Sequence, residues 1–403
     1  MGRGRALTIA LAAALVAALA LASSASAGTV NSRWLLTGAS QMPDNYWQGL
    51  VSNPDASQLF FIGPSQGLWQ TTPDLVQTAG VDKAIPVALK KSVGYNHIGD
   101  PTWLDGEGGR VVLPMECYNP AQDPSNTCGK GAFGIADPQT LAFRYYVQLD
   151  PKFIPKAMWA ETSPDGRLIW TSSGNDLIAY RASQVTQANA GPSGPELRPV
   201  RTLKNAVPPT GVTGAVFRHG NLLIAGESNH DYDVWSVNTN TGERKLKLEQ
   251  HFCGESEGLD LFSGLGGRLH WILAPSDDSG CTLTYGPTSA LLHFVRRPAR
   301  ERYDVNLTHL VLGASSGSSE IQVTATVKVI RDGGRPVRGA TVRFAGGRAR
   351  SDSGGVATVS TTLDTGGWFS AYARKGKRYG MSSQAAINTD QSPTGSSANP
   401  DRG

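Results

Sequence analysis

Short apolar stretches separated by polar turns run along most of the chain. Residues 213–243 are typical, because three runs rich in Val, Leu and Trp are bounded there by the turn-forming residues Gly, Asn and Asp. Runs with this length and these boundaries predict β-strands. No stretch after residue 27 repeats its apolar residues with the period of a helix, and the 47 glycines and 24 prolines fit a chain with many turns. The pattern therefore predicts an all-β protein.

A unit of strands recurs within residues 28–300. Each unit pairs an inner strand that ends in polar or acidic residues with a turn and further short strands. Radial repetition of such units is how a β-propeller protects its strand edges, so the repeats predict a five-bladed propeller. Residues 33–39 either complete the last blade and lock the ring or begin a sixth blade, and a stacked sandwich is the alternative fold. The units contain residues 47–75, 96–118 with 129–149, 157–183, 213–243, and 256–275 with 289–298.

The pattern changes after Arg300. Residues 301–386 alternate apolar and polar positions over short strands with glycine turns, which predicts a small β-sandwich. The segments DGGRPVRGATVRF, SDSGGVATV and WFSAYA, within residues 332–373, resemble bacterial Ig-like domains of the invasin type. A transthyretin-like sandwich is the close alternative. The resemblance implies a spacer or attachment module without catalytic residues, and residues 387–403 are predicted to be a disordered tail.

The N-terminus has the features of a secretion signal. Arg3 and Arg5 precede an apolar run over residues 6–22, and Ala25-Ser26-Ala27 fits the small-x-small cleavage rule. A membrane anchor is the alternative, but the run is rich in alanine and short for a span of about 20 residues. We therefore expect a signal peptide over residues 1–27, no transmembrane segment, and a secreted, extracellular monomer.

Four cysteines in an exported chain predict two disulfides. Proximity favours Cys117 with Cys128 and Cys253 with Cys281, which is one of three ways to pair them. A zinc site is the alternative, but the chain has no CxxC or HxxxH spacing.

The charges are unevenly distributed. The formal net charge is +4, and Arg3 and Arg5 contribute two of these charges. Residues 28–300 hold 22 Lys and Arg against 25 Asp and Glu, whereas residues 301–403 hold 13 against 8. Neither balance predicts a nucleic-acid partner.

Polar residues near the strand ends are the candidates for chemistry. Carboxylates there interrupt strong apolar runs, where a charge is costly unless it pairs, is protonated or binds a cation. The inner strands of a propeller converge on a central channel, so we expect these side chains to meet. The inner strands contribute His97, Asp100, Glu161, Glu257 and Asp260, and the second strands contribute Glu116, Glu227, Asn229 and His230.

Several carboxylates at one axis would repel each other. A hard cation with about six to eight oxygen ligands relieves this repulsion, so we expect Ca²⁺ as a cofactor. Its predicted ligands are Asp100, Glu116, Glu161 and Glu257, with His97 as ligand support or proton carrier. Zinc or manganese, held by His97 and His230, is one alternative. The other is structural: the acids bond backbone amides of the next blade and hold the ring closed.

The segments HIGD (97–100) and EGLD (257–260) resemble the calcium-bearing propellers of the gluconolactonase, paraoxonase and strictosidine-synthase type. In that family, acids and asparagines from successive blades hold one cation at the channel mouth. Asn175 and Asn229 are the counterparts found here for the asparagine ligands. The resemblance implies a lactonase or esterase.

Two functions fit these patterns. The first is a calcium-dependent hydrolase with His97 and Glu161 as catalytic residues, in which the cation polarises a carbonyl and His97 activates water. The second is a non-catalytic propeller that binds a small molecule, a polysaccharide or a protein, with the Ig-like domain as spacer. Four tryptophans near the unit starts are expected to pack between blades, with a sugar-stacking platform as the alternative: Trp47, Trp103, Trp159 and Trp271.

Overall fold

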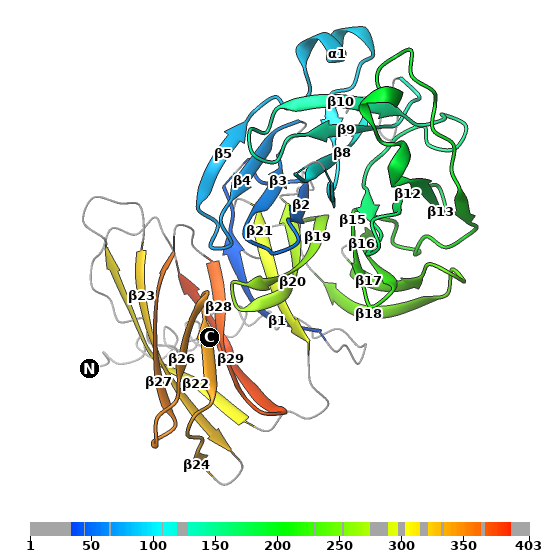
Figure 1. Ribbon diagram of the computed structural model, residues 1–403. Helices are drawn as coiled ribbons and strands as arrows, with labels where there is room; N and C mark the ends of the chain where they lie inside the picture. The colour runs from blue at the N-terminus through cyan, green and yellow to red at the C-terminus, as the bar shows by residue number, and fades with distance from the viewer. Residues whose placement is uncertain are drawn as a thin grey trace, which may run out of the picture.

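Strands make up most of the protein, as the sequence pattern predicts (Figure 1). The pattern does not predict α1 (Val87–Ser92), the one α-helix among the described residues, because six residues are too few to show a helical period. The described residues also include the 3₁₀ turns η2 (Ala182–Gln184) and η3 (Gln187–Asn189). No helix in the described part is long and apolar enough to cross a membrane. The structure is a computed structural model that describes residues 34–43, 45–63, 66–106, 108–118, 128–228, 231–251, 254–274, 289–296, 303–314, 321–331, 334–363 and 367–387.

Four antiparallel sheets follow one another along residues 49–251, within the described ranges. Their innermost strands lie side by side around a common axis, and the later strands of each sheet follow outward (Figure 1). The first sheet contains β2 (Gly49–Ser52), β3 (Leu59–Ile62), β4 (Leu68–Thr71) and β5 (Gln77–Val81); the second contains β6 (His97–Ile98), β7 (Thr102–Leu104), β8 (Arg110–Glu116), β9 (Ala132–Ala136) and β10 (Phe143–Gln148); the third contains β11 (Glu161–Thr162), β12 (Leu168–Ser173), β13 (Asp176–Arg181) and β14 (Arg201–Leu203); the fourth contains β15 (Gly214–Arg218), β16 (Asn221–Ser228), β17 (Asp231–Asn238) and β18 (Arg244–His251).

The N-terminal strand closes the ring of sheets. β19 (Glu255–Gly264), β20 (Gly267–Ala274) and β21 (Ala290–Arg296) form the next antiparallel set, and β1 (Trp34–Gln41) pairs with β21. Trp34 lies opposite Arg296 and Gln41 lies opposite Ala290. Within the segment 33–39, the described residues from Trp34 onward therefore join the sheet of β19 to β21 and tie the start of the ring to its end.

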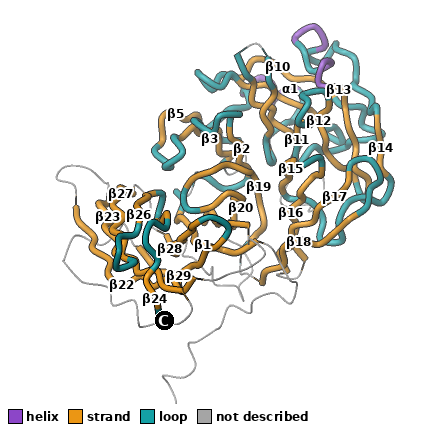
Figure 2. Tube along the Cα trace, turned by 60° about the horizontal axis from the view of Figure 1, so that its bottom comes forward, coloured by secondary structure: helices purple, strands orange, loops and turns teal. Residues whose placement is uncertain are grey.

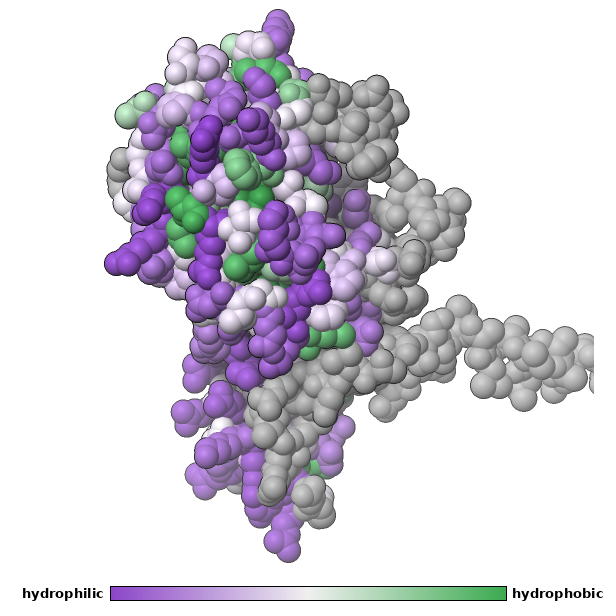
Figure 3. Space-filling model, turned by 90° about the vertical axis from the view of Figure 1, so that its right-hand side faces the viewer, coloured by the Kyte–Doolittle hydropathy of each residue, from purple (hydrophilic) through white to green (hydrophobic). Residues whose placement is uncertain are grey.

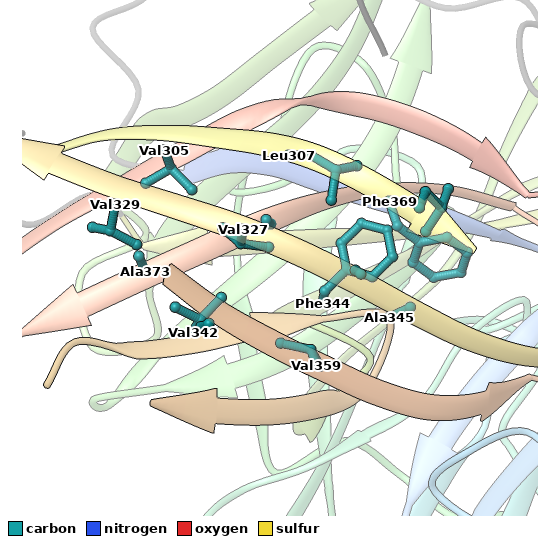
Figure 4. Packing of buried hydrophobic residues seen from close by; sticks show 14 of the residues in the cluster. Val305, Leu307, Val327, Val329, Val342, Phe344, Ala345, Val359, Phe369 and Ala373 are labelled. Carbon is teal, nitrogen blue, oxygen red and sulfur yellow. The ribbon is translucent and has the colours of Figure 1, made fainter. Parts of the chain in front are cut away.

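The C-terminal strands form a sandwich of two sheets. One sheet contains β22 (Tyr303–Ala314), β23 (Ile321–Arg331), β24 (Arg335–Pro336) and β27 (Val356–Leu363), and β25 (Thr341–Phe344), β26 (Gly347–Arg350), β28 (Gly367–Lys375) and β29 (Arg378–Ile387) face it. Alternate residues of β23, such as Val327 and Val329, point into the core between the sheets (Figure 4). The rings of Phe344 and Phe369 lie 6.2 Å apart in this core.

The sandwich and the ring share one sheet, which the sequence did not predict. β28 pairs with β1, with Gly38 opposite Phe369 and Ser40 opposite Gly367. One eight-stranded sheet consequently extends from β19 to β26 across the expected boundary near residue 300 (Figure 2). The expected tail boundary also moves by one residue, because Ile387 belongs to β29 and is only 2% exposed.

The predicted disulfide between Cys117 and Cys128 is present, with 5.6 Å between the Cα atoms. It follows β8 directly and holds the chain beside Glu116. Cys253 and Cys281, the other predicted pair, lie outside the described residues, as do the predicted signal peptide and residues 388–403.

A buried pair of histidines lies in the shared sheet, beside the sandwich. The Nδ1 atoms of His270 (β20) and His293 (β21) are 3.0 Å apart, and both side chains are fully buried. Nε2 of His270 lies 3.2 Å from the Phe262 carbonyl, which can only accept, so this nitrogen carries a proton. Nδ1 of His270 then accepts from Nδ1–H of His293, whose Nε2 accepts from the Ser40 hydroxyl at 2.8 Å. Every ring nitrogen has a partner only while both rings are neutral.

This chain of bonds predicts sensitivity to acid. Burial lowers the pKa of His270 to about 3, and burial together with His270 lowers the pKa of His293 well below its usual range. A histidine whose pKa is lowered by folding stabilises the folded state at pH values above its pKa in the unfolded chain, which is near 6.5. This contribution is lost as the pH falls below about 6.5. At pH 5 the loss should be about 2 kcal/mol for each histidine relative to pH 7.

The measurement is the melting temperature between pH 7 and pH 5, for the wild type and for the double variant His270→Phe/His293→Leu. We expect a shallower fall for the double variant even if its melting temperature at pH 7 is lower. The difference between the two slopes isolates the histidines, because buried carboxyls with raised pKa shift stability the opposite way. Parallel slopes would contradict the prediction.

Candidate functional site

Asp100 lies at the centre of the ring, where its carboxylate joins two sheets. It is 1% exposed, and it follows β6 in the second sheet. Oδ1 accepts a hydrogen bond from the backbone N–H of Leu50 in β2 at 3.0 Å, and Oδ2 accepts one from Ala215 in β15 at 3.1 Å. Burial raises the pKa of Asp100 well above its usual range, although the two amides lower it. The side chain thus spans the axis instead of lining an open channel.

Glycines make this close approach feasible. A Cβ atom on Gly258 of β19 would lie 2.6 Å from Oδ1 of Asp100 and 2.6 Å from the Leu50 nitrogen. A Cβ atom on Gly214 would lie 2.9 Å from Oδ2. Gly49 and Gly99 are packed against backbone at the same level. The sequence indicates this close approach, because a glycine recurs at the corresponding point at or beside four inner strands. The four segments are QGL (48–50), IGD (98–100), TGA (213–215) and EGL (257–259).

Glu161 and Asp260 bond neighbouring strands on one side of Asp100. Oε1 of Glu161 accepts from the Phe217 N–H at 2.8 Å, and Oε2 accepts from the Thr102 hydroxyl at 2.9 Å. Oδ2 of Asp260 accepts from the Ser52 N–H at 2.7 Å. Burial raises the pKa of Glu161 to about 8 and that of Asp260 to about 6. For these residues the structural alternative applies: they connect the inner strands of adjacent sheets.

The carboxylates are spread along the axis at different levels. Asp100 bonds residue 215 and Glu161 bonds residue 217 of the same strand, and likewise Asp100 bonds residue 50 and Asp260 bonds residue 52. Two residues along a strand span about 7 Å. Glu161 and Asp260 therefore lie about 7 Å from the level of Asp100.

His97 and Glu116 meet on the other side of Asp100. β6 pairs with β8 so that His97 lies opposite Glu116, and Nδ1 of His97 is 3.0 Å from Oε1 of Glu116. The contact is close, but its angle is not that of a hydrogen bond. Nε2 of His97 lies 2.5 Å from the side-chain nitrogen of Gln48, which precedes β2. The side chain of Glu116 is 4% exposed and that of His97 is 13% exposed, so solvent reaches only the histidine edge.

The partners of His97 determine which nitrogen is basic. A carboxylate beside Nδ1 favours the proton on that atom, so Nε2 carries the lone pair and accepts from the Gln48 amide. The ring of Tyr118 lies 5.1 Å from the imidazole and is 40% exposed. Gln48 and Tyr118 were not predicted, since neither residue type stands out in an apolar run.

Glu257 lies at the same end of the axis as His97. The next residue, Gly258, donates its N–H to the Gln48 carbonyl at 3.0 Å. Burial raises the pKa of Glu257 well above its usual range, and the carboxylates of Glu255, Glu227 and Asp100 raise it further. Within the described residues no hydrogen bond to the Glu257 carboxylate is found, in contrast to Asp100, Glu161 and Asp260. It is the inner-strand acid that does not bond a neighbouring strand.

The predicted calcium ligands do not fit a single site in this arrangement. Both carboxylate oxygens of Asp100 and of Glu161 accept protein hydrogen bonds, and Glu116 contacts His97. The described ranges contain no group of three or more His, Cys, Asp or Glu side chains that could hold a metal ion. Asn229 and His230 lie outside them. Calcium binding stays a prediction.

Calorimetry tests calcium directly. If the ion holds the ring together, EDTA lowers the melting temperature and added Ca²⁺ restores it, because a ligand that binds only the folded state stabilises it. If neither EDTA nor added Ca²⁺ changes the melting temperature, the prediction of a stabilising calcium ion is wrong.

Three of the four tryptophans named from the sequence, Trp103, Trp159 and Trp271, pack inside the protein. Trp159 and Trp271 are 1% exposed, and their indole N–H groups donate to Ser172 at 2.7 Å and to Ser256 at 3.0 Å. Trp103 is half-buried against Phe60, with 5.9 Å between the ring centres. None of these three offers an open face for a sugar.

No family model matches the chain, and no curated protein matches it. Among solved structures it is similar to a luciferin-regenerating enzyme, with 15% identity, a TM-score of 0.35, and coverage of 64% of this chain and 94% of that one. It is also similar to the β-propeller domain of Myceliophteria thermophila Cps50 (11% identity, TM-score 0.31, 80% and 98% covered). A third is the PQQ-bound aldose sugar dehydrogenase of Streptomyces coelicolor (10% identity, TM-score 0.32, 65% and 99% covered). Scores this low carry no argument about this chain.

The close packing around Asp100 predicts a steep cost for Gly258→Ala. The added methyl group would meet Asp100 and Leu50 at 2.6 Å, and overpacking should cost roughly 2–4 kcal/mol. Gly264→Ala is the matched control, because it lies in the same strand and its nearest neighbour would be a Phe262 ring atom at 3.5 Å. Urea unfolding of both variants checks this, and equal losses would contradict the central packing.

Proposed function

We propose that residues 34–296 form a five-bladed β-propeller with β19, β20, β21 and β1 as its last blade, and that residues 303–387 form an Ig-like sandwich. We propose further that the propeller of this exported protein is a hydrolase of the lactonase or esterase type. The observation that carries this proposal is the contact of His97 with Glu116 at the end of the axis where the Glu257 carboxylate bonds no neighbouring strand among the described residues. A histidine held by a carboxylate and a carboxyl group with raised pKa are the pair that acid–base catalysis requires.

His97 acts as the general base. A water molecule replaces the Gln48 amide as the donor to Nε2 of His97. Glu116 orients the ring and stabilises the imidazolium that forms when Nε2 takes a proton from this water. The hydroxide attacks the carbonyl carbon of an ester or lactone, and the bond to the alkoxide oxygen breaks. Catalytic contacts are often poorly aligned without substrate, so the angle between His97 and Glu116 does not oppose this role.

Glu257 acts as the general acid. Its raised pKa keeps more of the carboxyl group protonated at neutral pH, and it donates this proton to the departing alkoxide. The proton on His97 then returns to Glu257 or to solvent, which restores both groups. Glu161, expected from the sequence to act with His97, lies beyond Asp100 from it, and we assign to it the bond to Phe217 instead.

Rates with aryl esters and with small lactones test the proposal. His97→Ala should lower kcat/KM by about 10²–10⁴-fold, the usual contribution of a positioned base. Glu116→Gln and Glu257→Gln should lower it less, and the exposed His219→Ala should leave it unchanged. Equal rates for wild type and His97→Ala would sink the proposal. A loss in Glu161→Gln as large as that in His97→Ala would place Glu161 in the reaction.

A non-catalytic propeller that binds a polysaccharide is the second candidate. The observation in its favour is the exposed ring of Tyr118 beside His97, which offers a stacking face at the same end of the axis. Absence of turnover, together with sugar binding that Tyr118→Ala abolishes, would favour this function over the hydrolase.

A further inference from the structure

A groove lined by arginines lies between the propeller and the sandwich. Its volume is about 690 Å³. Arg268 of β20 and Arg296 of β21 form one wall, and β25, β26 and β28 form the other. No carboxylate side chain is among its lining residues. The four arginines of the sandwich wall are Arg343, Arg348, Arg350 and Arg374.

Strand alternation directs these arginines into the groove. In β25, Val342 and Phe344 are buried in the sandwich core, so Arg343 points to the opposite, exposed face. A two-residue turn at Ala345 and Gly346, both with positive φ (47° and 85°), sets the hairpin register. That register places Arg343 directly opposite Arg348. Like charges in facing positions destabilise a sheet, so this arrangement favours an anion between them.

The guanidinium groups are available to a ligand. Arg268, Arg296, Arg343, Arg348 and Arg350 are exposed, and in the described part of the chain none of them forms an ion pair with a carboxylate. Of the sandwich wall, Arg374 donates Nε–H to the Gly376 carbonyl at 3.0 Å, which leaves its terminal nitrogens to the groove.

The positive band continues beyond the groove. A second pocket of about 520 Å³ shares Arg296 with the first and is lined also by Arg218 and Lys247. Arg218 lies over the Trp34 ring at 5.3 Å. Burial lowers the pKa of Arg218, and the charges of Arg296 and Arg268 lower it further, so the three cations interact across the edge of the propeller. The two pockets together form an elongated basic track.

We propose that this track binds an extended anionic polysaccharide, whose carboxylate, sulfate or phosphodiester groups pair with the arginines. Guanidinium forks bind such groups bidentately, and a chain with regularly spaced charges can occupy both pockets at once. This site is separate from the one at His97, and neither proposal depends on the other. Because its two walls come from different units, the ligand contacts the propeller and the sandwich together.

Other polyanions fit the track less well. Tyr372 lines the first pocket and Trp34 lines the second, where Arg218 lies over its ring. The track therefore offers little stacking surface for the bases of a single-stranded nucleic acid. A membrane surface would need exposed apolar side chains for insertion, and the large exposed ones, such as Val76, Val200 and Val311, line neither pocket. On the face in Figure 3 the hydrophobic residues likewise form small, separate patches among hydrophilic ones.

Binding of the full chain to a heparin oligosaccharide and to polygalacturonate, with neutral dextran as control probe, tests the proposal. We expect binding to both anionic glycans that weakens with salt, and none to dextran. Arg343→Glu/Arg348→Glu should weaken it about tenfold or more. Arg268→Glu/Arg296→Glu should do the same from the opposite wall. His97→Ala should bind like the wild type.

Arg331→Glu/Arg335→Glu is the matched control, since these two arginines also face each other in the sandwich but lie outside the track. Its affinity should remain that of the wild type. The substituted arginines are exposed, and a melting curve for each variant checks that it folds. If Arg343→Glu/Arg348→Glu does not fold, Arg343→Gln/Arg348→Gln takes its place in the binding measurement. Three results would overturn the proposal: no glycan binding, equal binding by groove and control variants, or tighter binding to single-stranded DNA or anionic lipid vesicles than to the glycans.

Discussion

The carboxylate of Asp100 bonds inner strands of two different sheets, and the close packing of the inner strands at the centre of the ring depends on this bridge. A carboxylate buried without partners would cost several kcal/mol, and two backbone amides without acceptors would add to that cost. The hydrogen bonds between them lower the cost of burial for both the carboxylate and the amides, so these groups can be buried only together. The glycines at 214 and 258 follow from the same constraint, because any side chain there would push the strands away from Asp100. The centre of the ring is consequently filled by Asp100 and the strands around it.

The two ends of the axis differ because their acids differ in what they bond. Glu161 and Asp260 accept from strands of neighbouring sheets, which uses them for cohesion. At the other end Glu116 faces a histidine, and Glu257 bonds no neighbouring strand in the described part of the chain. A group already committed to a backbone amide is a poor proton carrier, whereas a desolvated carboxyl beside a partly exposed imidazole is well suited to proton transfer. The location of the proposed active site follows from this difference.

The pairing of β1 with both β21 and β28 makes one sheet of the last blade and half of the sandwich. The buried histidines occupy this sheet, where His293 lies between Ser40 and the ring of Phe369. A continuous sheet holds its two parts in a defined relation, since moving them would break backbone hydrogen bonds along the seam. The arginines of β20 and β25 therefore keep a constant separation, which makes the basic groove a preformed site.

The sequence alone determined what depends on local order: strands from short apolar runs, the disulfide from two nearby cysteines, and the position of His97, Asp100, Glu116 and Glu257 within or beside apolar runs. It could not tell a cation from a backbone amide as the partner of Asp100, because Leu50 and Ala215 lie 50 and 115 residues away. The basic groove was equally hidden, since its arginines are scattered from residue 268 to residue 374 in a chain of small net charge. Only the tertiary structure decided these points, because strand alternation specifies which face a side chain takes, while its partner depends on which distant strands meet there.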